Sequence, residues 1–191
     1  DNDNILFVSN RKNLANFEYE RLQPYIINLK TFEVSAPFTT YLDVSGLSMS
    51  PDKTKIAFMA TSGDSEIYIA DLSDQGKITQ ITNNNFADRF PSFSPDGNWI
   101  AYTRTESYQS SRQQIYSVRT ASRGGDVARL TEDNASREPA WSPDSRWIVF
   151  TSNRDGNPEV YIMSNNGQFQ VNLTNSPGVD MQPDWQPLPS P

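Results

Sequence analysis

The sequence repeats itself every 43 to 49 residues, and this period limits the folds that the chain can adopt. The prolines of a recurring Ser-Pro-Asp turn are spaced 44, 48 and 44 residues apart: Pro51, Pro95, Pro143 and, in a degenerate copy, Pro187. Two further markers keep the period, namely Tyr25, Tyr68, Tyr116 and Tyr161, and Thr39, Thr82, Thr131 and Thr174. Repeats of this length predict a β-propeller, whose blades stack around a central channel.

Residues 138–174 show the repeating unit most clearly. The turns Trp141-Ser-Pro-Asp, Arg154-Asp-Gly-Asn-Pro and Asn165-Asn-Gly separate four short runs that suit β-strands. Four such runs predict one antiparallel sheet, or blade. The aspartate that follows each marker proline can bond its own backbone. Because it recurs in each unit as Asp52, Asp96 and Asp144, we predict a turn-capping role rather than a metal site.

The period divides the chain into four predicted blades. Their boundaries are residues 1–40 plus 181–187, 46–82, 90–131 and 138–174. The first blade is split because Ile5-Leu-Phe-Val aligns with second strands such as Ile148-Val-Phe-Thr, whereas Gln182-Pro-Asp-Trp aligns with the first strand at Glu138-Pro-Ala-Trp. We therefore predict an all-β propeller of four four-stranded antiparallel blades, in which the C-terminal strand completes the N-terminal blade and closes the ring.

Two other arrangements remain open at this stage. An open arc could use its C-terminal strand to complete a blade of a second chain, which would give an eight-bladed, blade-sharing dimer. The four blades could also be a unit of a longer repeat protein. The sequence favours the closed monomer because closure within one chain avoids the entropy cost of association.

Several blocks resemble the TolB-like family of propellers with PD40 repeats, which are WD40-like. The blocks are Phe93-Ser-Pro-Asp-Gly with Trp99-Ile-Ala-Tyr, Trp141-Ser-Pro-Asp with Trp147-Ile-Val-Phe-Thr-Ser-Asn-Arg-Asp-Gly, and Val160-Tyr-Ile-Met. The resemblance implies a propeller scaffold with a protein or peptide partner, in the periplasm or elsewhere outside the cytoplasm. TolB itself resembles a six-bladed ring, so the four-blade count departs from it.

Composition excludes several classes of function. Histidine and cysteine are both absent, which rules out a Ser-His-Asp triad, a thiol nucleophile and zinc sites built from these residues. Related pectin-degrading lyases use a metal site containing histidines, so this chain cannot work as they do. The formal charge of −7 argues against a nucleic-acid surface, and no apolar run is long enough to span a bilayer. We therefore expect no enzyme activity, cofactor or metal.

We expect candidate site residues on the loops that join one blade to the next and ring one mouth of the predicted channel. They are Asp43, Asp88, Arg89, Arg137, Glu138 and Asp180. These residues could be solvated or form salt bridges between blades, or they could bind a protein or peptide partner, which is the function we predict. The alternative is a carbohydrate-binding or carboxylate-only glycan-active propeller that stacks sugars on tryptophan or tyrosine.

Overall fold

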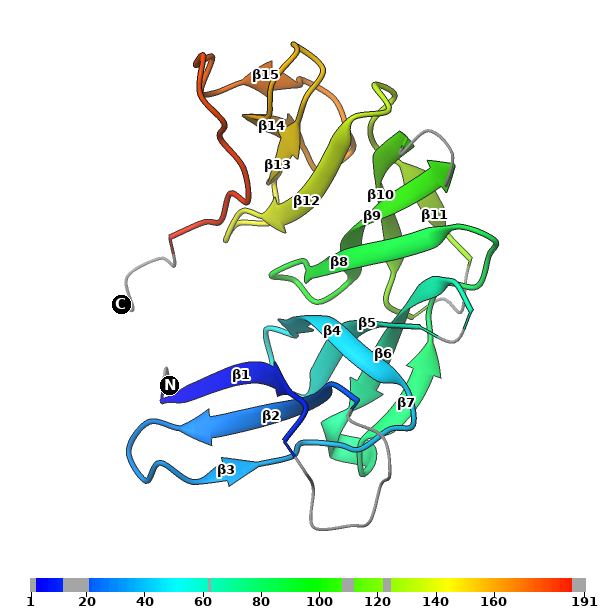
Figure 1. The fold of residues 1–191 in the computed structure, drawn as a ribbon, viewed down its shortest axis with the longest axis vertical. Coiled ribbons are helices and arrows are strands. Elements are labelled where there is room, and N and C mark those ends of the chain that lie inside the picture. Colours follow the sequence, from blue (N-terminus) through cyan, green and yellow to red (C-terminus); the bar gives the residue numbers. More distant parts are fainter. Residues whose placement is uncertain (1–2, 12–20, 62, 108–111, 122–124, 187–191) are drawn as a thin grey trace.

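The chain folds into four antiparallel β-sheets arranged in an arc, with both termini at its opening (Figure 1). The structure is a computed structural model that describes residues 3–11, 21–61, 63–107, 112–121 and 125–186. Blade 1 has three strands, β1 (Asn4–Ser9), β2 (Gln23–Asn28) and β3 (Val34–Ser35). Blade 2 has β4 (Asp43–Met49), β5 (Lys55–Thr61), β6 (Ser65–Asp71) and β7 (Lys77–Gln80), with a short 3-10 turn at Leu72–Asp74.

The other two sheets repeat the four-stranded plan. Blade 3 has β8 (Ala87–Phe93), β9 (Trp99–Ser107), β10 (Arg112–Arg119) and β11 (Val127–Arg129). Blade 4 has β12 (Ser136–Trp141), β13 (Trp147–Ser152), β14 (Glu159–Ser164) and β15 (Val171–Asn172). The all-β class and the antiparallel blades are confirmed.

Apolar joints hold each blade to the next. The apolar residue that ends one blade inserts into the core of the following blade: Phe38, Ile81 and Leu130 are 5, 2 and 6 % exposed. Each joint also buries an aromatic pair from the second and third strands of the following blade, such as Phe150 and Tyr161, whose ring centroids lie 5.6 Å apart. The recurring tyrosines of the sequence are therefore packing residues.

The first strand of each four-stranded blade contains a bulge at a fixed place. Gly46, Phe90 and Glu138 have φ angles of 58, 53 and 57°, and the strand register shifts beside each of them. A residue with a positive φ at a bulge bends the strand and changes its direction. Gln182 in the C-terminal tail has the same φ of 57°, and its N–H donates to Thr151 Oγ1 as that of Glu138 donates to Thr103 Oγ1. The tail thus has the shape of a first strand.

The tail lies against blade 4 and forms no strand within the described residues. Trp185 Nε1 donates to Ala140 O at 3.1 Å, while β1 pairs with β2. Ring closure, the four-blade count, the blade boundaries and the blade-sharing dimer therefore stay predictions. Parts of the predicted first blade, residues 1–2, 12–20 and 187, lie outside the described residues. Among the residues described, none forms a helix long and apolar enough to cross a membrane.

The Ser-Pro-Asp turns are built as predicted. Asp52 Oδ1 accepts hydrogen bonds from Ser50 Oγ at 2.6 Å and from Thr54 N at 3.0 Å. Asp96 and Asp144 are bonded in the same way within their own turns. The hydrogen bond from the Ser50 side chain is the main reason that the pKa of Asp52 falls to about 2.

We expect Asp52→Asn to lower thermal stability at neutral pH, and the deficit to shrink as the pH falls. The folded-state pKa is below the unfolded value, so the carboxylate stabilises the native state above about pH 4 and loses this effect as the pH approaches 2. Circular dichroism melts at pH 7 and pH 3 measure the difference, with the exposed Asp74→Asn as control. A deficit that stays constant with pH would contradict this account.

Candidate functional site

Five of the six predicted site residues lie on successive first strands of the arc, and the six do not form one cluster. Four of them are inside strands β8 and β12, and Asp43 begins β4. Their predicted position in connecting loops is therefore wrong for these five, because each first strand begins earlier than the sequence suggested. Asp180 lies in the tail. No hydrogen bond or ion pair joins any two of the six within the described chain.

Asp88 is fully buried and forms a bidentate ion pair with Arg104 inside blade 3. Arg104 donates from Nε and Nη2 to the two carboxylate oxygens at 2.8 and 2.9 Å. The Arg104 guanidinium also lies 4.5 Å from the ring centroid of Tyr116. Burial alone would lower the pKa of Arg104, but the hydrogen bonds to Asp88 hold it above its usual value. Asp88 thus acts within the blade and is not available at the rim.

A second buried carboxylate joins this pair across the joint between blades 2 and 3. The Asn84 side-chain amide donates to Glu66 Oε2 at 3.2 Å and to Asp88 Oδ2 at 2.8 Å. Burial raises the pKa of Glu66, although hydrogen bonds from Thr82 and Asn84 oppose the increase. The Asn84 amide thus connects a carboxylate of blade 2 to one of blade 3, which fixes this joint.

Blade 4 contains a related arrangement that the sequence analysis missed. Arg154 Nε lies 2.7 Å from Asp133 Oδ2, and its guanidinium lies 4.5 Å from the Tyr161 ring centroid. Arg11 in blade 1 is stacked in the same way on Phe7 and Tyr25. In the sequence, each of these arginines lies two or four residues after the aromatic residue of the second strand. An alignment of the repeats on that aromatic would have shown the recurring arginine.

Arg89 and Arg137 are the two basic site residues, and neither forms an ion pair within the described residues. They occupy equivalent positions, each just before the bulge residue of its strand. Arg89 Nε is buried and has no hydrogen-bond partner among the described residues. Arg137 donates one hydrogen bond, from Nη1 to Asn153 Oδ1 at 2.6 Å. Guanidinium groups bind carboxylates and backbone carbonyls, so these two side chains can bind such groups.

The remaining site residues are held by local hydrogen bonds or are exposed. Glu138 Oε2 accepts a hydrogen bond from Thr151 at 3.0 Å, and Asp43 Oδ1 accepts one from Leu22 N at 2.8 Å. The backbone N–H of Asp180 donates to Pro158 O at 2.9 Å. Glu138 therefore fits a structural role between strands, whereas the Asp180 side chain has no hydrogen bond or ion pair within the described residues.

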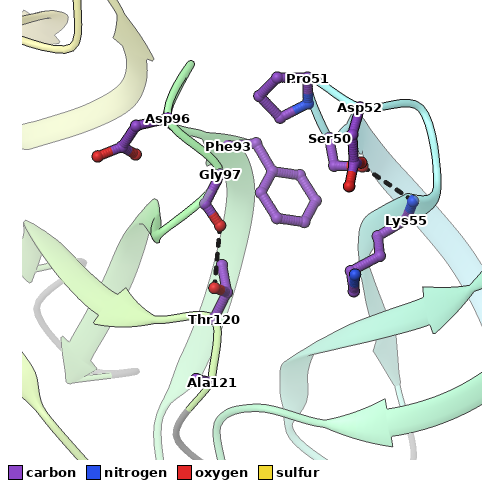
Figure 2. A pocket seen from close by; sticks show the side chains of 9 residues that line it. All are labelled: Ser50, Pro51, Asp52, Lys55, Phe93, Asp96, Gly97, Thr120 and Ala121. Atoms are coloured by element: carbon purple, nitrogen blue, oxygen red, sulfur yellow. Dashed lines mark hydrogen bonds between the residues drawn. The ribbon is translucent and has the colours of Figure 1, made fainter.

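A pocket of about 310 Å³ lies between the turns of blades 2 and 3, at the ends of β4 and β8 away from the predicted mouth (Figure 2). The Phe93 ring lies between the two turns, and Thr120 Oγ1 donates to Gly97 O at 3.0 Å. The two carboxylates on its wall, Asp52 and Asp96, are already bonded within their own turns. Across the described residues, no group of three or more acidic side chains is placed to hold a metal ion.

The tryptophans do not form an open surface for sugar stacking. Trp141 is buried in the joint between blades 3 and 4, and Trp99 packs against the same core. Trp185 is tied to the backbone of β12 by its indole N–H. Of the four, only Trp147 is among the exposed large apolar residues of the described chain.

Comparison with known proteins agrees with this architecture. Residues 5–138 match the PD40 family, described as the TolB beta propeller domain. This chain belongs to that family. The Tol-Pal system protein TolB of Francisella tularensis subsp. holarctica (strain OSU18) is 41 % identical to this PD40 chain over 123 residues, which is 64 % of the chain and 27 % of that protein. The PD40 chain therefore spans about a quarter of the length of such curated relatives.

Two solved structures extend the similarity of the PD40 chain to the fold. TolB from Acinetobacter baumannii superposes with a TM-score of 0.70 at 27 % identity, covering 90 % of this chain and 41 % of that one. A putative TolB from Agrobacterium tumefaciens gives a TM-score of 0.72 at 26 % identity, covering 83 and 57 % of the two chains. The predicted resemblance to TolB-like propellers is thus confirmed.

Proposed function

We propose that this chain is a non-catalytic propeller scaffold that binds a protein or peptide segment at the mouth marked by Arg89 and Arg137. The observation that carries the proposal is the Arg89 side chain on the first strand of blade 3, whose buried Nε has no hydrogen-bond partner among the described residues, in a chain of the PD40 family. A partner segment that brings a carboxylate or backbone carbonyls would satisfy it. Leaving such a donor buried and unpaired otherwise costs about 1–3 kcal/mol.

The rigid joints support a scaffold role. Blades 2 and 3 each contribute to two buried cores, so a partner would meet groups that need little ordering on binding. By family membership, we also propose a place in a Tol-Pal-type system and an extracytoplasmic, periplasmic location. Carbohydrate binding is not favoured because the tryptophans mostly pack inside the joints.

The proposed site at the mouth is tested with the variant Arg89→Gln/Arg137→Gln. A pull-down from an envelope extract identifies the captured protein, and a titration then measures its affinity for the original chain and for the variant. We expect the affinity to fall about tenfold or more, because desolvated charge pairs at interfaces are worth about 2 kcal/mol or more. The matched control is Lys77→Gln/Arg146→Gln, which removes the same charge from exposed positions outside the mouth. Equal affinity for both double variants would contradict the proposed site.

We further propose that the tail completes blade 1 of its own chain, so that the propeller closes as a monomer. The strand-like bulge at Gln182 supports this. The outward face of blade 4 also supports it, because Leu173 is 53 % exposed where its counterparts Phe38, Ile81 and Leu130 are buried by a following blade.

A further inference from the structure

Blade 1 contains an arginine that is held like the arginine of a four-stranded blade. Arg11 lies 5.0 Å from the ring centroid of Phe7 and 4.8 Å from that of Tyr25. Its backbone N–H and its Nε both donate to Ser9 Oγ, at 3.2 and 3.3 Å. Arg154 in blade 4 makes the same two hydrogen bonds to Ser152 Oγ, at 3.3 and 3.1 Å. Arg11 is therefore held like its counterpart in a complete blade.

In blades 3 and 4, the stacked arginine reaches polar groups on or beside the first strand. Arg104 binds Asp88 of β8, and Arg154 binds Asp133 just before β12. Arg154 Nη2 also donates to Ser136 Oγ, the first residue of β12, at 3.2 Å. Arg11 has no ion pair within the described residues, where the sheet of blade 1 consists of β1, β2 and β3.

The tail contains an acid at the matching position. Asp180 lies two residues before Gln182, which has a positive φ. The same spacing separates Asp88 from Phe90 in blade 3, and Ser136 from Glu138 in blade 4. In blade 4, Ser136 is opposite Ser152 and Ala140 is opposite Val149. Transferring this register to the tail places Asp180 opposite Ser9, and Asp184 opposite Leu6.

In a closed ring, the joint between blades 4 and 1 would differ from the other joints on its outer side, at the turn between the third and fourth strands. A Cβ added to Gly76 would lie 2.6 Å from Phe38 Cβ, and one added to Gly167 would lie 2.6 Å from Leu130 O, so these turns need glycine to meet the preceding blade. The corresponding turn of blade 1, residues 29–33, has no glycine. The match between the tail and blade 1 is therefore confined to the inner side, near Arg11.

We infer that Asp180 is the acid partner of Arg11, and that their ion pair fixes the tail of the same chain to blade 1. The guanidinium, already stacked on two rings, would receive the one carboxylate that lacks a partner at the correct register. The inference rests on the closure proposed above, and it assigns Asp180 to closing the ring rather than to the partner site.

Charge reversal tests the ion pair. We expect Arg11→Glu and Asp180→Arg each to lower the melting temperature by about 2–5 °C, and the combined variant to recover most of the loss. Arg11→Glu combined with Asp184→Arg is the control, and there the effects should add. Strict additivity in Arg11→Glu/Asp180→Arg would overturn the ion pair.

An introduced disulfide tests closure separately. The chain has no cysteine, so Leu6→Cys/Asp184→Cys carries only two thiols, neither of them in the ion pair. We expect these to form a disulfide within a monomer under mild oxidation, as read by mass spectrometry and solution molar mass. A disulfide-linked dimer would overturn same-chain closure, and free thiols would overturn closure altogether. A monomeric disulfide with additive charge reversals would overturn the ion pair alone.

Discussion

Arg104→Met is expected to lower the free energy of unfolding by about 3–5 kcal/mol, because it leaves the Asp88 carboxylate buried without its partner. Chemical denaturation in urea measures the loss. Arg129→Met is the control: this arginine pairs with Glu106 and Glu132 near the surface, where an ion pair is worth about 1 kcal/mol or less.

A second variant separates the charge from the packing. Replacing both partners, in Asp88→Leu/Arg104→Met, should recover part of the loss because no unpaired charge remains buried. If Arg104→Met were no more harmful than Arg129→Met, the ion pair would not be a main source of stability in blade 3. The same result matters for binding studies, since Asp88→Ala would act through folding and not through the rim.

Phe150→Ala is expected to cost about 3–5 kcal/mol, since it empties the joint between blades 3 and 4. The ring is fully buried, stacks on Tyr161 and lies 5.5 Å from the Arg154 guanidinium. Urea denaturation gives the loss from the shift of the midpoint. Phe169→Ala in the same blade is the control, with an expected change near zero because its side chain is 73 % exposed. Similar losses for both variants would contradict the assignment of the joint.

The period of the sequence was sufficient to predict the blades because it marks turns and core positions directly. Asp52 and its two counterparts cap their turns, as the repetition indicated. The tyrosines pack within the sheets for the same reason. Ring closure could not be established in this way, because complementary chain ends are compatible with more than one partner for the tail.

The candidate site was harder to predict because its positions differ from blade to blade. Asp88, Ser136 and Asp180 share one place in the repeat, yet the first is buried in an ion pair and the last has no side-chain partner within the described chain. The difference depends on the arginine that follows the second-strand aromatic. Spacing alone does not show whether a first-strand acid faces such an arginine or the solvent.

Site-specific crosslinking tests the central claim most directly, namely that this propeller binds a protein or peptide at the mouth near Arg89. A photoreactive phenylalanine analogue at Phe90, beside Arg89 and 40 % exposed, is compared with the same analogue at Phe169 on an outer turn. In an envelope extract, we predict a specific adduct at position 90, identified by mass spectrometry, and none at position 169. An adduct at position 169 alone, or at neither position, would contradict the proposal.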